Sequence, residues 1–383
     1  MRNPISSPPK MHPMVNESAT EKSGTSISLQ STPRKSTIWS ISIAVLLVAG
    51  LVYYFFVYNR SGATPPTTDQ QLTTPKKDSI EPPKPAYANL TPVDTALYNQ
   101  KVLALNNGDS SGLWPVKAVY PTPGAILPFN RIIAFYGNLY SKNMGILGEL
   151  PRAQMLAKLK QECTKWEKAD PNTPVQPALH YIAVTAQGSP GKNGKYRLRM
   201  PFNQIDTVLS MAKEINALVF LDVQVGLGTL QEEIPALEKY LSMPNVHLGI
   251  DPEFSMKGGQ RPGLAVGTFD ASDINYVSDY LAQLARKNNL PPKILIVHRF
   301  TQRMVTNYKE IKKRPEVQLI MHMDGWGFPA KKLTTYRMFI HNEPVQFTGF
   351  KLFYKNDLRD NGRLLSPEEL MKLKPLPLYI QYQ

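Results

Sequence analysis

Short apolar runs alternate with longer amphipathic stretches from Arg131 to the end of the chain. The runs are rich in Val, Ile, Leu and aromatic residues, which favour buried β-strands. Eight such runs are present, at residues 131–137, 178–184, 217–224, 246–251, 293–300, 317–324, 347–354 and 376–382. Near-continuous apolar strands of this kind are typical of a parallel sheet covered by helices.

Helices are predicted between these runs, at residues 152–168, 204–216, 230–241, 271–288 and 301–312. Ser272, which follows Asp270, lies where the N-cap region of the fourth helix is expected. Eight strand units in one α/β domain predict a (β/α)₈ TIM-like barrel. A doubly wound open sheet is the alternative, but "FYGNLYSKNMG" after the first strand lacks the glycine spacing of a dinucleotide-binding loop.

The eighth strand ends close to Gln383, so no eighth helix is expected after it. A helix within residues 93–106 is expected to fill that gap in the outer ring or to cover the floor of the barrel.

One apolar stretch differs from all the others in length. Residues 37–58 read "TIWSISIAVLLVAGLVYYFFVY", 22 residues without a charge, long enough to cross a bilayer. Arg34 and Lys35 precede it, and this bias predicts a single-pass signal-anchor with a cytoplasmic N-terminus. The barrel is then expected to be periplasmic or extracellular, and the lipid bilayer is an expected partner.

The remaining N-terminal sequence is poor in large apolar residues. Residues 1–36 are rich in Ser, Thr and Pro and predict a disordered cytoplasmic leader. Residues 59–89 are rich in Pro and Thr and predict a linker. The folded domain is therefore expected at residues 90–383.

Charge and cysteine content narrow the classes of function. The formal net charge of +14 favours acidic partners such as anionic polysaccharide, but it equally describes a solvated basic surface. Nucleic-acid binding would rest on charge alone, and an exported domain argues against it. The single cysteine, Cys163, excludes an intramolecular disulfide and a cysteine-rich metal site. No cofactor motif is present.

Polar residues collect at the carboxyl ends of the predicted strands, where the loops of a barrel build the active-site mouth. Because side chains alternate between faces with period two, Asp222 and Gln224 share a face, as do Asp251 and Glu253, and as do His322 and Asp324. The other candidates for this mouth are Asn138, His298, Trp326, Tyr354 and Gln381.

The histidines divide into two groups by position. His180 and His247 lie early in their predicted strands and are expected to be packing residues. His298 and His322 lie late, and with the nearby carboxylates they could bind a divalent metal. Barrel metallohydrolases usually carry a His-x-His pair on the first strand, and "RIIAFYGN" has none.

Two loops beside the predicted mouth leave alternatives open. The glycine-rich segment 255–271 either lines the mouth or simply connects two elements. The basic insertion 186–201, with Lys192, Lys195, Arg197 and Arg199, is either a flap that touches an anionic ligand or a solvated hairpin.

The stretch "GIDPEF" resembles the end of the fourth strand in barrel glycoside hydrolases of the chitinase-like and lysozyme-like families. The resemblance implies that Glu253 is a general acid and that Asp251 orients it or the substrate, with Asp324 or Asp222 as the second carboxylate. The sequence departs from these families at His247 and Gly249, where chitinases carry Asp. The segments "FLDVQVG", "DPEF" and "HMDGWG" together resemble an uncharacterised group of membrane-anchored bacterial envelope barrels.

The sequence thus predicts a membrane-anchored glycoside hydrolase-like barrel that acts on cell-envelope or extracellular polysaccharide. Two alternatives stay open: a non-catalytic glycan-binding barrel, and a metal-dependent hydrolase that uses His298 and His322.

Overall fold

A computed structural model describes residue 90 and residues 92–383, without the side chain of Asp360. The predicted leader, signal-anchor and linker lie outside these residues. Within the described part of the chain, no helix is long and apolar enough to cross a bilayer.

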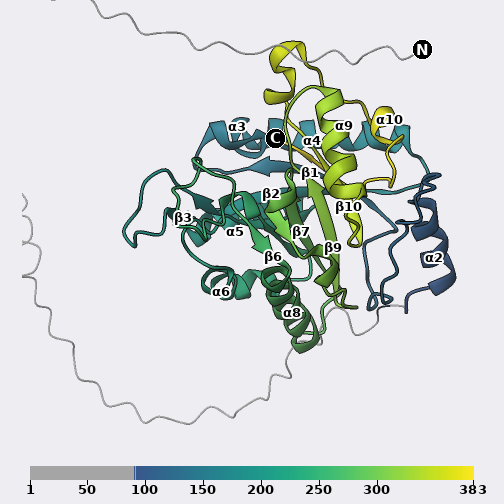
Figure 1. Ribbon diagram of the computed structural model, residues 1–383, viewed down its shortest axis with the longest axis horizontal. Helices are drawn as coiled ribbons and strands as arrows, with labels where there is room; N and C mark the ends of the chain where they lie inside the picture. The colour runs from purple at the N-terminus through teal and green to yellow at the C-terminus, as the bar shows by residue number, and fades with distance from the viewer. Residues whose placement is uncertain (1–89, 91) are drawn as a thin grey trace, which may run out of the picture. The chain divides into compact units, whose positions relative to one another are not determined.

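Eight parallel strands form the closed barrel that the sequence predicts (Figure 1). Their order around the barrel is β1, β2, β4, β5, β7, β9, β10, β11 and back to β1. The closing register pairs Ile133 with Ile380. The strands are β1 (Arg131–Gly137), β2 (Val175–Ala186), β4 (Leu218–Val223), β5 (Val246–Ile250), β7 (Lys293–Arg299), β9 (Val317–Met323), β10 (Phe347–Leu352) and β11 (Tyr379–Tyr382).

Three further strands are short. β3 (Arg197–Arg199) pairs antiparallel with the end of β2, and β6 (Phe269–Asp270) pairs with β8 (Val305–Thr306). Every residue of β1, β7 and β9 is buried, because one face packs on helices and the other fills the barrel. This double burial explains why the sequence shows continuous apolar runs.

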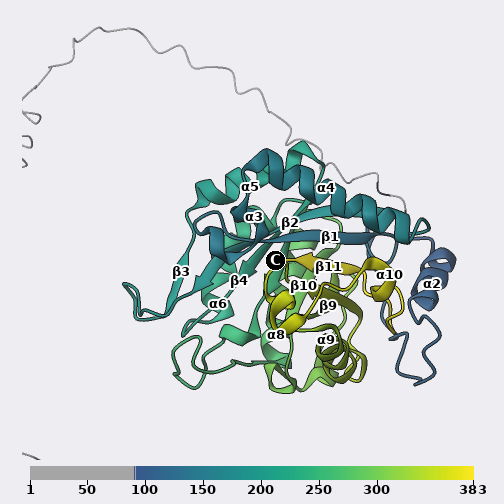
Figure 2. The same ribbon diagram turned by 90° about the horizontal axis from the view of Figure 1, so that it is seen from above.

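The helices surround the strands, as the view from above shows for α4 and α5 beside β1 and β2 (Figure 2). They are α2 (Thr95–Ala104), α3 (Ile146–Glu149), α4 (Arg152–Ala169), α5 (Phe202–Glu214), α6 (Leu230–Glu233), α7 (Glu238–Leu241), α8 (Ala271–Lys287), α9 (Pro329–Tyr336) and α10 (Pro367–Leu370). α9 continues as the π-helix η6 (Arg337–His341), and the 3₁₀ turns are η1 (Lys142–Met144), η2 (Pro235–Leu237), η3 (Pro252–Phe254), η4 (Gln302–Met304), η5 (Tyr308–Glu310) and η7 (Asn356–Asn361).

The cap of α8 is Asp270 rather than Ser272. The Asp270 side chain accepts a hydrogen bond from Ser272 N at 3.0 Å, and Asp273 bonds back to Asp270 N at 2.7 Å. This reciprocal arrangement is a capping box, which satisfies two free amides at the helix start.

The predicted helix at residues 301–312 is wrong. The chain forms η4, β8 and η5 there instead. The buried guanidinium of Arg299 binds the carbonyl oxygens of Thr301, Gln302 and Val305 at 3.3, 2.9 and 3.2 Å. Carbonyl groups turned toward Arg299 cannot accept the hydrogen bonds of a regular helix, so the segment wraps around that side chain. The predicted helix at 230–241 is also interrupted, because Pro235 starts a separate 3₁₀ turn.

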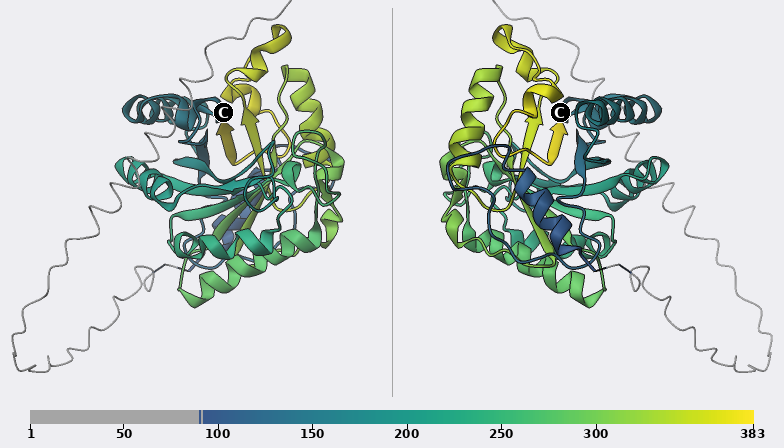
Figure 3. Two further views of the ribbon diagram at one scale, coloured as in Figure 1. Left: turned by 90° about the vertical axis from the view of Figure 1, so that its left-hand side faces the viewer. Right: turned by 90° about the vertical axis from the view of Figure 1, so that its right-hand side faces the viewer.

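The N-terminal helix covers the barrel floor. Leu105 packs against the apolar cluster inside the barrel and its carbonyl oxygen accepts from Leu376 N at 2.8 Å. Leu127 bonds through its amide and its carbonyl to the side chain of Gln318 at the start of β9, at 3.1 and 2.6 Å. Figure 3 shows α2 lying in front of the strands in its right-hand view. The opposite end of the barrel therefore remains for a site.

Candidate functional site

The strand register brings polar side chains to one level inside the barrel. Neighbouring strands pair Tyr136 with His180, Asp222 with Gly249, His298 with His322, and Lys351 with Gln381. All of these polar side chains are buried. Below them the interior is apolar, with residues such as Phe220 and Ile296. The polar level thus begins where the strands approach their carboxyl ends, as in other parallel barrels.

A cavity of about 460 Å³ lies above this level. Three carboxylates line it, Asp251, Glu253 and Asp324, together with Lys351 and Gln224. Its walls also include Tyr136, Asn143, Met144, Ile182, Thr185, Ala186, Phe254, Phe300, Gly325, Trp326, Lys331, Thr335, Phe353 and Gln383. This volume falls in the range of ordinary ligand pockets, and the convergence of charge within it marks the candidate site.

Glu253 is held in place by the residue two positions before it. Asp251 follows β5 and caps η3, and its Oδ1 accepts a hydrogen bond from Glu253 N at 3.0 Å. Burial raises the pKa of Glu253 to about 7, and the negative charge of Asp324 acts in the same direction. Lys351 and His298 oppose this shift. Near neutral pH, Glu253 is therefore protonated in a substantial fraction of the molecules.

Asp324 has the opposite environment. Burial would raise its pKa, but Lys351 and His298 hold that pKa well below the usual range. Lys351 Nζ lies 2.8 Å from Asp324 Oδ1, and His298 Nδ1 lies 2.7 Å from Oδ2. Asp324 is therefore ionised at neutral pH, in the same cavity as the protonated Glu253.

Asp251 and Gln224 form a third group on the cavity wall. Burial raises the pKa of Asp251 well above the ordinary value, and Glu253 adds to the shift. Gln224 Nε2 contacts Asp251 Oδ2 at 3.4 Å and Tyr136 Oη at 3.3 Å. A protonated Asp251 can therefore support Glu253 without adding a negative charge to the site.

Trp326 supplies an exposed aromatic face at the rim. It is 41% exposed, and Lys331 Nζ lies 4.7 Å from its ring centroid. Asp357 organises the adjoining loops, because it accepts from Gly327 N at 3.0 Å and from Phe353 N at 2.9 Å and pairs with the buried Lys332 at 2.6 Å. An aromatic ring held at a cavity rim is suited to stack on a sugar ring.

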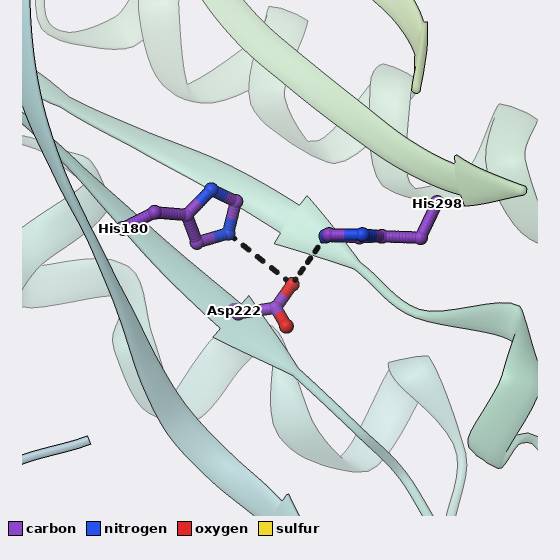
Figure 4. Close-up of side chains that lie close together, drawn as sticks. All are labelled: His180, Asp222 and His298. Carbon is purple, nitrogen blue, oxygen red and sulfur yellow. Dashed lines mark ion pairs between the residues drawn. The ribbon is translucent and has the colours of Figure 1, made fainter. Parts of the chain in front are cut away.

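A second polar network is buried inside the barrel, and Figure 4 shows its members His180, Asp222 and His298. Asp222 Oδ1 lies 3.4 Å from His180 Nε2 and 3.4 Å from His298 Nε2. Burial lowers the pKa of His180 to about 4, whereas the pKa of His298 rises to about 10, because Asp222 and Asp324 outweigh the effect of its burial. In the absence of any other cation, His298 is thus an imidazolium between two carboxylates.

The sequence-predicted candidates fall into three locations. Glu253, Asp251, Asp324, Gln224 and Trp326 line the cavity. Asp222, His298, His322 and Gln381 lie outside its lining, fully buried in the barrel. Gln381 bonds to Tyr379 Oη at 2.9 Å and contacts His180 Nδ1 at 3.0 Å, and neither partner lines the cavity.

Asn138 and Tyr354 do not reach the cavity, which corrects their assignment as ligand contacts. Asn138 is fully buried, donates to Ile182 O at 2.9 Å and accepts from Tyr140 N at 2.6 Å, so its amide is used by the backbone. Tyr354 stacks on Tyr382 with ring centroids 5.3 Å apart and packs against the outer core. Tyr354 comes after the end of β10 at Leu352, so the alternation of the strand no longer determines which way its side chain points.

Sequence reasoning missed several residues of the site. Tyr136 and Lys351 line the cavity, and His180 is not a simple packing residue, because it contacts Asp222. The alternation of side chains along a strand could have identified Tyr136 and Lys351. Tyr136 lies two positions after Ala134, and Lys351 lies two positions after Gly349, so both are on the inward face of their strands. His247 is a packing residue as predicted, and its Nδ1 accepts from Ile294 N at 3.1 Å.

Contacts in the structure favour one alternative for each of the two loops. Segment 186–201 is a hairpin whose Arg197 and Arg199 bind the buried Glu233 at 2.6 and 2.7 Å, which occupies both guanidinium groups. Segment 255–271 is a connector after η3, and none of its residues is among those that line the cavity. Gly267 fits there because a Cβ would lie 2.5 Å from Pro252 O and Ser255 O.

No family model matches the sequence, and no curated protein matches it. Similar solved structures include the cellulase Cel5C_n, which is 14% identical with a TM-score of 0.36 over 61% of this chain and 69% of the other. Thermotoga maritima Cel5A is 9% identical with a TM-score of 0.33 over 67% and 88%. Burkholderia cenocepacia dihydropteroate synthase is 9% identical with a TM-score of 0.30 over 67% and 86%. These TM-scores are low, so the barrel assignment rests on the closed strand pairing.

Proposed function

We propose that this protein is a glycoside hydrolase, with Glu253 as general acid and Asp324 as the ionised partner carboxylate. The observation that supports the proposal is the opposite shift of the two pKa values within one cavity. Pairs of carboxyl groups whose environments separate their pKa values are suited to acid and base roles in a single reaction.

Glycosidic bond cleavage needs both roles. The protonated Glu253 would donate its proton to the leaving oxygen, which lowers the barrier by avoiding a free alkoxide. The ionised Asp324 would either attack the anomeric carbon, forming a glycosyl-enzyme that water then hydrolyses, or take a proton from a water molecule that attacks this carbon directly. Lys351 keeps Asp324 ionised, and Trp326 offers a stacking surface for a sugar ring.

The substrate class and the cellular location of the protein are further parts of this proposal, and both are inferred from the sequence. An exported barrel, tethered through residues 37–58, would meet cell-envelope or extracellular polysaccharide. Residues 37–58 lie outside the described residues. The proposal that they form a membrane tether rests on the length of their apolar run.

The test is hydrolysis of a panel of aryl glycosides, β-linked glucans and mannans, chitooligosaccharides and peptidoglycan by the purified chain. Glu253→Gln is expected to lower kcat on the natural glycan by a factor of about 10² to 10⁴. Glu310→Gln, at an exposed site away from the cavity, is the matched control and should leave kcat unchanged.

Two outcomes would contradict the proposal. Full activity of Glu253→Gln on every cleaved glycan would exclude its role as the acid. Glycan binding without turnover by the wild type would instead identify a non-catalytic glycan-binding barrel.

A further inference from the structure

Three side-chain atoms converge inside the barrel without completing hydrogen bonds. They are His180 Nε2, Asp222 Oδ1 and His298 Nε2, and all lie within 4.8 Å of one another (Figure 4). Each side chain is fully buried, and none of the three atoms has a hydrogen-bond partner among the residues that the structure describes. Buried polar atoms in this condition cost free energy unless a proton, water or ion bridges them.

The second polar atom of each side chain is already engaged, which fixes the direction of the free atom. The contacts are Tyr379 Oη to His180 Nδ1 at 2.5 Å, Tyr136 Oη to Asp222 Oδ2 at 2.7 Å, and Asp324 Oδ2 to His298 Nδ1 at 2.7 Å. Metal-binding histidines direct one ring nitrogen to a fixed polar partner while the other faces the ion. His298 Nδ1 contacts the Asp324 carboxylate in this way, whereas His180 Nδ1 contacts both Tyr379 Oη and Gln381 Nε2, the latter at 3.0 Å.

A glycine lies directly against the converging atoms. Gly249 lies at the same level on β5, and a Cβ added there would lie 2.5 Å from both Asp222 Oδ1 and His180 Nε2. Asp222 Oδ1 and His180 Nε2 therefore pack against the backbone of β5, and any side chain at position 249 would displace them.

We propose that His180, Asp222 and His298 form a binding site for a divalent first-row transition metal ion, with zinc as its representative. Two imidazole nitrogens and one carboxylate oxygen are a donor set that such ions accept. Ligands about 2.1 Å from a tetrahedral zinc ion are separated by about 3.4 Å. The two nitrogen-to-oxygen distances in the structure, from Asp222 Oδ1 to His180 Nε2 and to His298 Nε2, are both 3.4 Å.

A proton alone fits these distances less well. Hydrogen bonds between an imidazolium and a carboxylate have lengths of about 2.7–2.9 Å. His298 makes such a bond to Asp324 at 2.7 Å, but not to Asp222. The same short bond argues against the other ligand set, His298 with His322 and Asp324, because an ion bound by His298 Nδ1 and Asp324 would have to break it.

The ion would connect to the cavity through one side chain. Coordination at Nε2 fixes the ring of His298, and Nδ1 of that ring holds Asp324 on the cavity wall. A metal ion here positions a carboxylate of the candidate site from below. The binding itself does not depend on the proposed function, since it can be measured without any substrate.

Elemental analysis of the purified full chain tests the site directly. After incubation with zinc and removal of the free ion, we expect one zinc per chain. Removing it with a chelator is expected to lower Tm by roughly 5 °C relative to protein in zinc at about a hundred times its Kd. Cobalt substitution should give the visible absorption of a tetrahedral site. Wild-type protein that retains no zinc and shows no Tm change would overturn the proposal.

Variants locate the ion. His180→Asn keeps a group at the Nδ1 position and removes Nε2, so binding is expected to fall at least about 100-fold. His247→Asn is the matched control, a second fully buried histidine of the barrel interior, and should bind zinc as the wild type does. Gly249→Ala keeps all three ligands and should also lose the ion. Zinc that stays stoichiometric in both His180→Asn and Gly249→Ala would place it elsewhere and reject this site.

Discussion

Lys351 Nζ lies 2.8 Å from Asp324 Oδ1, and both side chains are buried at the wall of the cavity. The ammonium group also lies 3.9 Å from the ring centroid of Tyr136. The pair joins β10 to the end of β9, two elements that each contribute one charge to the barrel interior. This ion pair holds Asp324 ionised beside Glu253, whose pKa is raised to about 7.

Replacing Lys351 by Met should destabilise the fold. The change leaves the buried carboxylate of Asp324 with His298 as its remaining charged partner, and breaking such a pair costs about 3 kcal/mol of unfolding free energy. Urea denaturation measures the loss. Lys355→Met is the control, because its salt bridge to Glu149 is on the surface, and should cost less than about 1 kcal/mol. Equal losses for the two variants would refute the assigned role of Lys351.

Stability should depend on pH through Glu253. Its pKa rises from 4.5 to about 7 on folding, so the folded state binds the proton more tightly and loses stability as pH rises between these values. Between pH 4.5 and 7.5, wild type should lose on the order of 2 kcal/mol more than Glu253→Gln. The charges that face Glu253 are Asp324, Lys351 and His298, with Asp251 beside it, and both proteins retain them. Parallel stability curves for the two proteins would show that Glu253 has no raised pKa.

Trp326→Ala should weaken glycan binding if the rim stacks on a sugar ring. Loss of the aromatic face is expected to raise Kd about tenfold, with little effect on kcat. Calorimetric titration with the cleaved glycan or its fragments measures this change. Phe328→Ala is the matched control, since Phe328 is 48% exposed in the same loop but is absent from the cavity lining. A similar change in Kd for both variants would argue against a specific stacking role.

Glu233→Gln should release the hairpin at residues 186–201. Glu233 is fully buried and binds both Arg197 and Arg199, so the change removes the charge that holds the hairpin against α6. Limited trypsin digestion under native conditions should then cleave the hairpin at least about tenfold faster. Glu232→Gln is the control, because the Glu232 side chain is exposed and forms only a long ion pair, to Lys195 at 3.6 Å, while its contact with Arg199 is through the backbone carbonyl. Unchanged cleavage of Glu233→Gln would show that other contacts hold the hairpin.

The sequence by itself determined the barrel and the level of the site. Eight apolar runs became eight strands because burial on both faces of a parallel strand favours apolar residues along most of its length. The polar positions after the apolar runs also placed Asp251, Glu253 and Asp324 at the carboxyl ends, where they line one cavity. Period-two spacing did not decide which side chains reach it, because Glu253 lies in η3 and because Asp222 and His322 lie outside the cavity lining. These features depend on local pattern and are encoded within each segment.

Only the tertiary structure decided the partners. Lys351 contacts Asp324, and His180 contacts Asp222. Each contact joins side chains that lie on, or directly follow, two neighbouring strands of the barrel, and the spacing within a single strand does not reveal it. The segment 301–312 likewise has a helical sequence pattern but forms an irregular loop. Its carbonyl groups accept hydrogen bonds from the buried guanidinium of Arg299 instead of from helix amides. Strand pattern fixes which way a side chain points, but barrel closure and stagger set which charges it faces. Those charges, together with burial, determine each pKa and thereby the chemistry available to the site.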